Sequence, residues 1–251
     1  MLDSLLASIN KFSPFLLLLL AVTFAWWWRR DQALRREAFI RDAQLPRGLY
    51  DALRKRRPEL NLKDCQLVNA ALRQFFLAHL KSGRRYVSMP SQVVDDLWHE
   101  FILHTRNYEE FCRRAFGRFL HHTPAAVLGS SGGKTNAGLR RCWWHVCKLE
   151  NINPRQATRM PLLFALDHKL GIAGGFVYAL DCANTLRRAD DGSVVYCGAD
   201  LGTYGEGNFG DGGGSASGWS FSGFSFGGGD GGGSDGGGDG GGCGGGGCGG
   251  D

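Results

Sequence analysis

The sequence predicts a mainly α protein in three parts: a single-pass transmembrane helix, a compact helical domain and a disordered glycine-rich C-terminal tail. Three observations support this prediction. An uncharged apolar run occupies residues 12–28, and apolar side chains recur at helical spacing through the middle of the chain. From residue 201 onward more than half of the residues are glycine. The predicted parts are residues 1–30 (anchor), 31–44 (juxtamembrane basic helix), 45–199 (helical domain) and 200–251 (acidic tail).

The apolar run FSPFLLLLLAVTFAWWW ends in three tryptophans and is followed at once by arginines. As a helix it would be about 26 Å long, which is near the lower limit for a bilayer core of about 30 Å. Tryptophans suit the membrane interface, and the positive-inside rule places the arginine-rich side in the cytoplasm. We therefore expect the membrane as a partner through the N-terminal helix, with the C-terminal domain cytoplasmic at the cell membrane. A cleaved signal peptide is the alternative, with Thr23 and Ala25 as a weak cleavage site.

Charge is divided between a basic body and an acidic tail. The segment from Asp200 to Asp251 has seven acidic residues and no Lys or Arg. Such a tail is too rich in glycine to build a core, so we expect it to be disordered. The basic body can attract anionic lipid or nucleic acid, but a basic surface beside a membrane is the simpler interpretation. Nucleic-acid binding is disfavoured because no aromatic platform accompanies the basic stretches.

Helix-breaking prolines and glycines, together with the spacing of apolar residues, indicate the helices and strands of the central domain. Pro58 and Gly83 bound one amphipathic helix, whose apolar residues recur at intervals of three and four. Ser91 is a suitable N-cap for the next helix. The helices expected are residues 31–41, 49–57, 65–80, 91–114, 139–149, 161–169 and 176–188, with a short strand at 194–196.

The helix that begins near Ser91 carries the candidate site. At 100° per residue, Asp95 lies about 40° from His99, and Asp96 lies about 60° from it on the other side. His104 lies about 140° from His99, so one straight helix does not bring these two histidines to one ion.

A second pair of histidines, His121 and His122, follows Gly117. If the chain folds back at this glycine, one of the pair meets Asp95 and His99. A carboxylate with two or three imidazoles suits Zn²⁺, Fe²⁺ or Mn²⁺. The candidate metal ligands are therefore Asp95, His99, His121 and His122. The structural alternative is a helix-end histidine pair and an ordinary surface ion pair.

The same segment resembles a known family. Val94, Asp95, Trp98 and His99 form V-D-x-x-W-H, and Tyr108, Cys112, Gly117 and the histidine pair follow. This pattern is similar to the glycine-rich domain-containing protein-like family, which has plant and bacterial members, over roughly residues 45–182. Plant members commonly read W-H-x-H, whereas Glu100 and Phe101 follow His99 here. The resemblance implies a poorly characterised domain and no established reaction.

The cysteines are expected to be reduced in a cytoplasmic domain. Cys142, His145 and Cys147 form C-x2-H-x-C, which is a poor zinc pattern. Cys243 and Cys248 lie in the glycine-rich tail, where no role is assigned to them.

Three function classes remain open. The first is a membrane-tethered helical binding or scaffold module with an unknown protein partner. The second is a metal-dependent enzyme, such as a hydrolase, with Asp96 or Glu100 as base. The third is an anionic-lipid or nucleic-acid binder that uses residues 54–57 and the pair Arg84 and Arg85.

Overall fold

The structure is a computed structural model that describes residues 2–122, 132–180 and 195–202. Its elements, in chain order, are α1 (Leu2–Asp42), α2 (Leu49–Arg56), α3 (Leu62–Lys81), α4 (Gln92–Leu103), α5 (Thr105–Phe116), α6 (Gly132–Leu149), α7 (Leu162–Lys169), β1 (Val177–Ala179), β2 (Val195–Cys197) and α8 (Gly198–Gly202). The prediction of a mainly α chain is confirmed.

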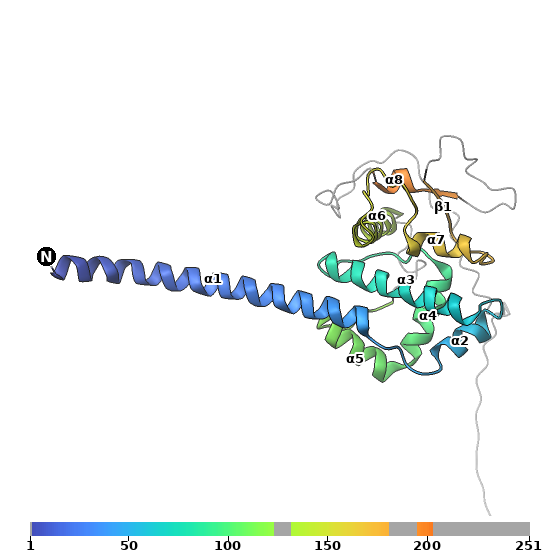
Figure 1. Ribbon diagram of the computed structural model, residues 1–251, viewed down its shortest axis with the longest axis horizontal. Helices are drawn as coiled ribbons and strands as arrows, with labels where there is room; N and C mark the ends of the chain where they lie inside the picture. The colour runs from blue at the N-terminus through green and yellow to red at the C-terminus, as the bar shows by residue number, and fades with distance from the viewer. Residues whose placement is uncertain (1, 123–131, 181–194, 203–251) are drawn as a thin grey trace, which may run out of the picture.

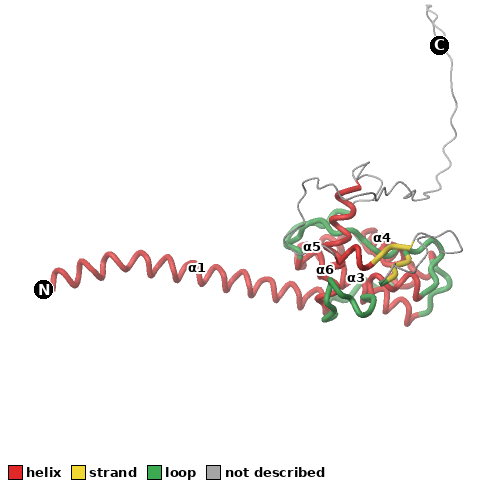
Figure 2. The backbone as a smooth tube through the Cα atoms, turned by 90° about the horizontal axis from the view of Figure 1, so that it is seen from above, coloured by secondary structure: helices red, strands yellow, loops and turns green. Residues whose placement is uncertain are grey.

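The long helix α1 projects from a compact helical body and touches it only near its C-terminal end (Figures 1 and 2). There Ile40 is fully buried, and the Phe39 ring packs 5.7 Å from the Phe111 ring of α5. Helix α3 lies at the centre of the body and packs against α4, α6 and α7 (Figure 1).

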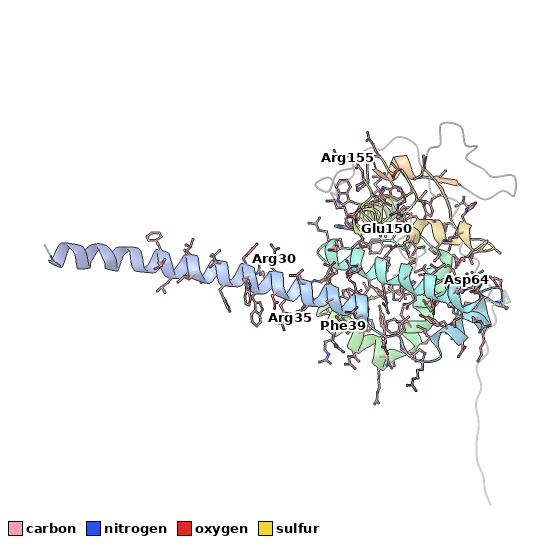
Figure 3. The ribbon with its side chains drawn as sticks, in the orientation of Figure 1. Arg30, Arg35, Phe39, Asp64, Glu150 and Arg155 are labelled. Atoms are coloured by element: carbon pink, nitrogen blue, oxygen red, sulfur yellow. The ribbon has the colours of Figure 1, made fainter. Side chains whose placement is uncertain are left out.

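The predicted transmembrane anchor is wrong. Among the helices in the described part of the chain, none combines enough length with enough apolar character to cross a membrane. The single-pass topology and the cell-membrane localisation with a cytoplasmic domain, which rested on that anchor, are corrected with it. The physical reason is composition: α1 continues unbroken past Trp28 into Arg29 and Arg30, and tryptophan adds little hydropathy. Arg30 and Arg35 both lie on the projecting part of the helix (Figure 3).

The helix expected at residues 91–114 is two helices. His104, with ψ of 61°, ends α4 and begins α5. This break changes the direction of the chain, so Thr105–Phe116 does not continue the face of α4. No glycine or proline marks the position in the sequence.

The C-terminal part of the body contains a small sheet. Val177–Ala179, expected to begin a helix, forms β1 and pairs in parallel with β2, with Tyr178 opposite Tyr196. The predicted strand near residues 194–196 is confirmed by β2. The acidic glycine-rich tail, with Cys243 and Cys248, lies outside the described residues apart from its first few positions.

An aromatic cluster forms the core between α3, α4 and α5. The Phe76 ring centroid lies 4.9 Å from that of Phe111, 6.0 Å from that of Phe116 and 6.1 Å from that of Trp98. Tilted and edge-on ring pairs of this kind add to the stabilisation that burial alone provides. The cluster therefore fixes α4 relative to α3, and α4 carries most of the candidate site.

His79 is a structural member of this core. It is 4% exposed, its Nδ1 lies 3.0 Å from the Arg85 carbonyl oxygen, and its ring meets the edge of Phe116. Burial lowers the pKa of His79 to about 4, and the positive charges of Arg84 and Arg118 act in the same direction. The imidazole is therefore neutral near pH 7, with Nδ1–H donating to the carbonyl.

We expect this histidine to make the domain sensitive to mild acid. Because its folded-state pKa lies below the unfolded value, the unfolded state binds the extra proton between about pH 6.5 and pH 4. The stability is complete above the unfolded pKa and falls as the pH drops. Between pH 7.5 and pH 5 the loss from His79 should be about 2 kcal/mol.

Urea unfolding at the two pH values measures this loss. His79→Phe cannot take up a proton, so its free energy of unfolding should fall less over the same interval than that of the wild type. Equal losses in the two proteins would assign the acid sensitivity to other groups.

Candidate metal centre

The start of α4 is held by a carboxylate from another part of the chain. Ser91 caps the helix, since its Oγ accepts from the Val94 N–H at 3.3 Å. Asp167 of α7 in turn accepts from the Ser91 hydroxyl at 2.6 Å and from the Gln92 and Val93 N–H groups at 2.7 and 3.2 Å. A negative charge at a helix N-terminus is favourable. These bonds fix the first turn of α4, immediately before Asp95.

Three of the four predicted ligands come together. His122 Nε2 lies 3.0 Å from Asp95 Oδ1, and His99 Nδ1 lies 3.4 Å from Asp95 Oδ2. The two imidazole centroids are 4.3 Å apart. One ligand atom from each of these residues lies within 4.8 Å of the other two. The carboxylate thus stands between two histidines that reach it from different segments.

The chain returns to α4 through a short, well-anchored turn. Gly117 ends α5 with φ of 73°, a conformation that glycine adopts without strain. The Tyr108 hydroxyl then donates to the Leu120 carbonyl at 2.6 Å and accepts from Trp98 Nε1 at 3.2 Å. The His122 ring packs against the face of α4 at 4.6 Å from the Trp98 ring. These contacts place His122 beside Asp95.

The hydrogen bonds indicate which nitrogen of His99 is available to an ion. Its Nδ1 lies 2.9 Å from the Asp95 carbonyl oxygen, which can only accept. Nδ1 therefore carries the hydrogen, and Nε2 carries the lone pair. A metal-binding histidine commonly uses its second nitrogen in this way, because the hydrogen bond fixes the orientation of the ring.

The ligand atoms of Asp95, His99 and His122 are close to the separations that a small metal ion requires. Metal–ligand bonds near 2.1 Å require donor atoms no more than about 4.2 Å apart, and one candidate donor atom from each residue lies within 4.8 Å of the other two. The His99 side chain is 41% exposed, against 13% for Asp95 and 16% for His122. The cluster is therefore open to solvent on the His99 side, while the other two residues are held by protein.

The fourth predicted ligand and the other acids do not join this cluster. His121 is exposed and its ring makes a tilted contact with Phe119, with ring centroids 4.8 Å apart. Asp96 accepts from Arg57 Nε at 2.9 Å, and Glu100 accepts from Arg56 Nη2 at 2.8 Å. The two acids that were candidates for a base are thus paired with arginines at the end of α2 and just after it.

These ion pairs also engage the first of the two predicted basic stretches. Arg56 and Arg57 face α4, and Arg54 Nε donates to the Leu60 carbonyl. Arg56 and Arg57 therefore hold the end of α2 against α4.

The cysteine-containing pattern in α6 offers little to a metal. Cys142 and Cys147 are buried, and burial raises the pKa of the Cys147 thiol to about 12. Metals bind the thiolate, which such an environment disfavours. Among the described residues these cysteines do not belong to a group of metal-ligating side chains.

The sequence did not reveal how two residues, Asp167 and Trp98, support the site. Asp167 lies 45 or more residues from each of the three ligands, and no local pattern links it to the first turn of α4. Trp98 was singled out through the resemblance, but its contact with His122 depends on the turn at Gly117. The sequence did show that Trp98 and His99 are consecutive and lie on adjacent faces of one helix, so the tryptophan is next to a candidate ligand.

The fold and this cluster define a mainly helical domain with a candidate carboxylate–histidine metal centre. The model of the UCP032817-like family matches residues 35–201, which is more than half of the chain. The chain therefore belongs to the UCP032817-like family. No match was found among curated proteins or among solved structures.

Proposed function

We propose that this domain is a metal-binding module in which Asp95, His99 and His122 hold one divalent transition metal ion, with Zn²⁺, Fe²⁺ and Mn²⁺ as candidates. The convergence of the three side chains carries the proposal. One carboxylate and two imidazoles form a ligand set that these ions accept. An ion bound there would join α4 to the segment that follows Gly117, so the ion would stiffen a surface offered to a protein partner.

The experiment is metal titration of the full chain with Co²⁺ as a spectroscopic probe, followed by Zn²⁺ competition and elemental analysis. We expect one equivalent to bind. His122→Ala should weaken binding by at least about tenfold, because the ion loses one of its three protein ligands. Affinity should also fall as the pH drops, since the imidazoles bind only when they are unprotonated.

His121→Ala is the matched control, since it removes the neighbouring imidazole, which contacts Phe119 instead of facing Asp95. This variant should bind Co²⁺ as the wild type does. A stoichiometry near zero, or equal losses in the two variants, would rule out the proposed centre.

A second candidate function is a metal-dependent hydrolase. Three protein ligands leave a coordination position for water, as in catalytic zinc sites, and the exposed side of His99 gives access to solvent. Hydrolysis of a chromogenic ester by the Zn²⁺-loaded chain tests this candidate. Turnover that disappears in His122→Ala and persists in His121→Ala would support it, and turnover equal in both variants would exclude it.

We also propose kinship with the glycine-rich domain-containing proteins. The support is the V-D-x-x-W-H segment, in which Asp95 and His99 are two of the proposed ligands and Trp98 packs against the third. Because Phe101 stands where plant members commonly have a second histidine, the second imidazole in this chain would come from His122. Metal titration of a plant member and of its W-H-x-H variants would show whether the two arrangements are equivalent.

A further inference from the structure

Three arginines from separate segments meet at the end of α5. Arg36 of α1 and Arg84, in the loop after α3, both donate to the Phe116 carbonyl oxygen, at 3.3 and 3.0 Å. Arg118, just beyond Gly117, donates to the Arg84 carbonyl. A Cβ at Gly117 would lie 2.8 Å from Arg36 Nη2, so this guanidinium lies directly over the glycine. We call Arg36, Arg84 and Arg118 the arginine cluster.

The cluster has no compensating negative charge in the described part of the chain. None of its members forms an ion pair there, although Arg35 and Arg41 of α1 and Arg114 of α5 do. Glu37, the acid next to Arg36, is held by Arg41 and Lys81. Desolvation and the neighbouring charges of Arg36 and Arg118 lower the pKa of Arg84. Like charges held together in this way oppose folding unless an anion neutralises them.

Backbone geometry also singles out Arg84. Its φ is 62°, in the left-handed region that side chains other than glycine and asparagine rarely adopt. The strain is maintained by a bond from the Arg84 N–H to the His79 carbonyl at 2.9 Å. The same loop is held by buried His79, which contacts the Arg85 carbonyl. The fold thus sets the backbone at Arg84, and the bond to the Phe116 carbonyl places its guanidinium.

A purely structural role explains only part of this arrangement. A cation at a helix C-terminus is favourable, and one guanidinium would satisfy the Phe116 carbonyl. A second guanidinium on that carbonyl and a third beside it add mutual repulsion without satisfying another acceptor of α5. A ligand with several anionic oxygens accounts for all three.

From this geometry we infer that the arginine cluster binds a phosphate group, either as the free ion or as a phosphomonoester. Guanidinium groups match the oxygens of phosphate through paired N–H donors, and phosphate offers enough oxygens for three arginines. A single carboxylate offers only two oxygens. The side chains of Arg36 and Arg84 are partly buried and that of Arg118 is exposed, so a ligand reaches the cluster from solvent.

The test is calorimetric titration of the full chain with inorganic phosphate and, separately, with glycerol phosphate. Ionic strength is held constant with chloride, and a chelator removes metals. We expect saturable binding of at least one of the two ligands, with their relative affinity showing whether the free ion or the monoester is preferred. Arg84→Gln and Arg118→Gln should each weaken binding by at least about tenfold, because each removes a charge-assisted contact.

Matched controls separate a site from general surface charge. Arg113→Gln removes the same charge from an exposed position in the last turn of α5 and should leave phosphate affinity unchanged. Asp95→Asn disables the proposed metal centre and should also leave it unchanged. Arg118 is exposed, so its variant keeps the test valid if Arg84→Gln fails to fold. No saturable binding, or a loss in Arg113→Gln equal to that in Arg118→Gln, would overturn the inference.

Discussion

Asp167→Ala should lower the free energy of unfolding by about 3 to 5 kcal/mol, because it leaves two buried and two partly buried donors without this acceptor. The Asp167 carboxylate accepts from the Ser91 hydroxyl and from the N–H groups of Gln92, Val93 and Phe176. It is 2% exposed, so water does not replace it. Two of these donors belong to the first turn of α4, where no intrahelical acceptor exists.

Asp64→Ala is the matched control for a capping carboxylate. Asp64, at the start of α3 in Figure 3, forms a capping box with Asn61, but its bonds are exposed. Its loss should cost about 1 kcal/mol, and thermal or urea unfolding measures both variants. If Asp167→Ala costs no more than Asp64→Ala, the carboxylate does not organise the start of α4. A Co²⁺ affinity reduced in Asp167→Ala alone would tie this cap to the metal centre.

Local patterns in the sequence predicted most helices because each buries one apolar face. The run from Leu67 to Phe76 is an example: its periodicity places Leu72, Phe75 and Phe76 in the core, where they lie in the structure. Two features depend on distant partners and escaped this reasoning. The break at His104 lacks a glycine or proline, and the three-residue strand β1 exists because β2 pairs with it.

The candidate ligands also divide into those that local spacing predicts and those that depend on distant contacts. Asp95 and His99 share a helical face by their spacing alone, so their proximity was predictable. The choice between His121 and His122 was not, because it depends on how the returning chain is oriented by Tyr108 and Leu120. The pairing of these acids with Arg56 and Arg57 is also long-range, which is why Asp96 and Glu100 remained candidates for a base. The transmembrane prediction failed because the apolar run at residues 12–28 does not give any described helix enough apolar length to cross a membrane.

Trp98→Ala should both destabilise the domain and weaken metal binding. Trp98 is 4% exposed, and its ring lies 5.0 Å from Phe75 on one side and 4.6 Å from His122 on another. Removing a buried tryptophan leaves a cavity, and such truncations cost about 3 to 5 kcal/mol. The His122 ring would lose the surface against which it packs, so Co²⁺ affinity should fall by at least about tenfold.

Two other tryptophan substitutions show whether the effect requires a ring beside His122 or follows from the loss of any tryptophan. Trp98→Phe retains a ring against His122 but removes the indole N–H that meets the Tyr108 hydroxyl, so it should retain more Co²⁺ affinity than Trp98→Ala. Trp28→Ala removes a ring that is 53% exposed on α1 and should change neither unfolding nor Co²⁺ binding. His122 comes to Asp95 from outside α4, so its position depends on packing against the Trp98 ring. A folded Trp98→Ala protein that binds Co²⁺ with wild-type affinity would show that the turn after Gly117 positions His122 without the tryptophan.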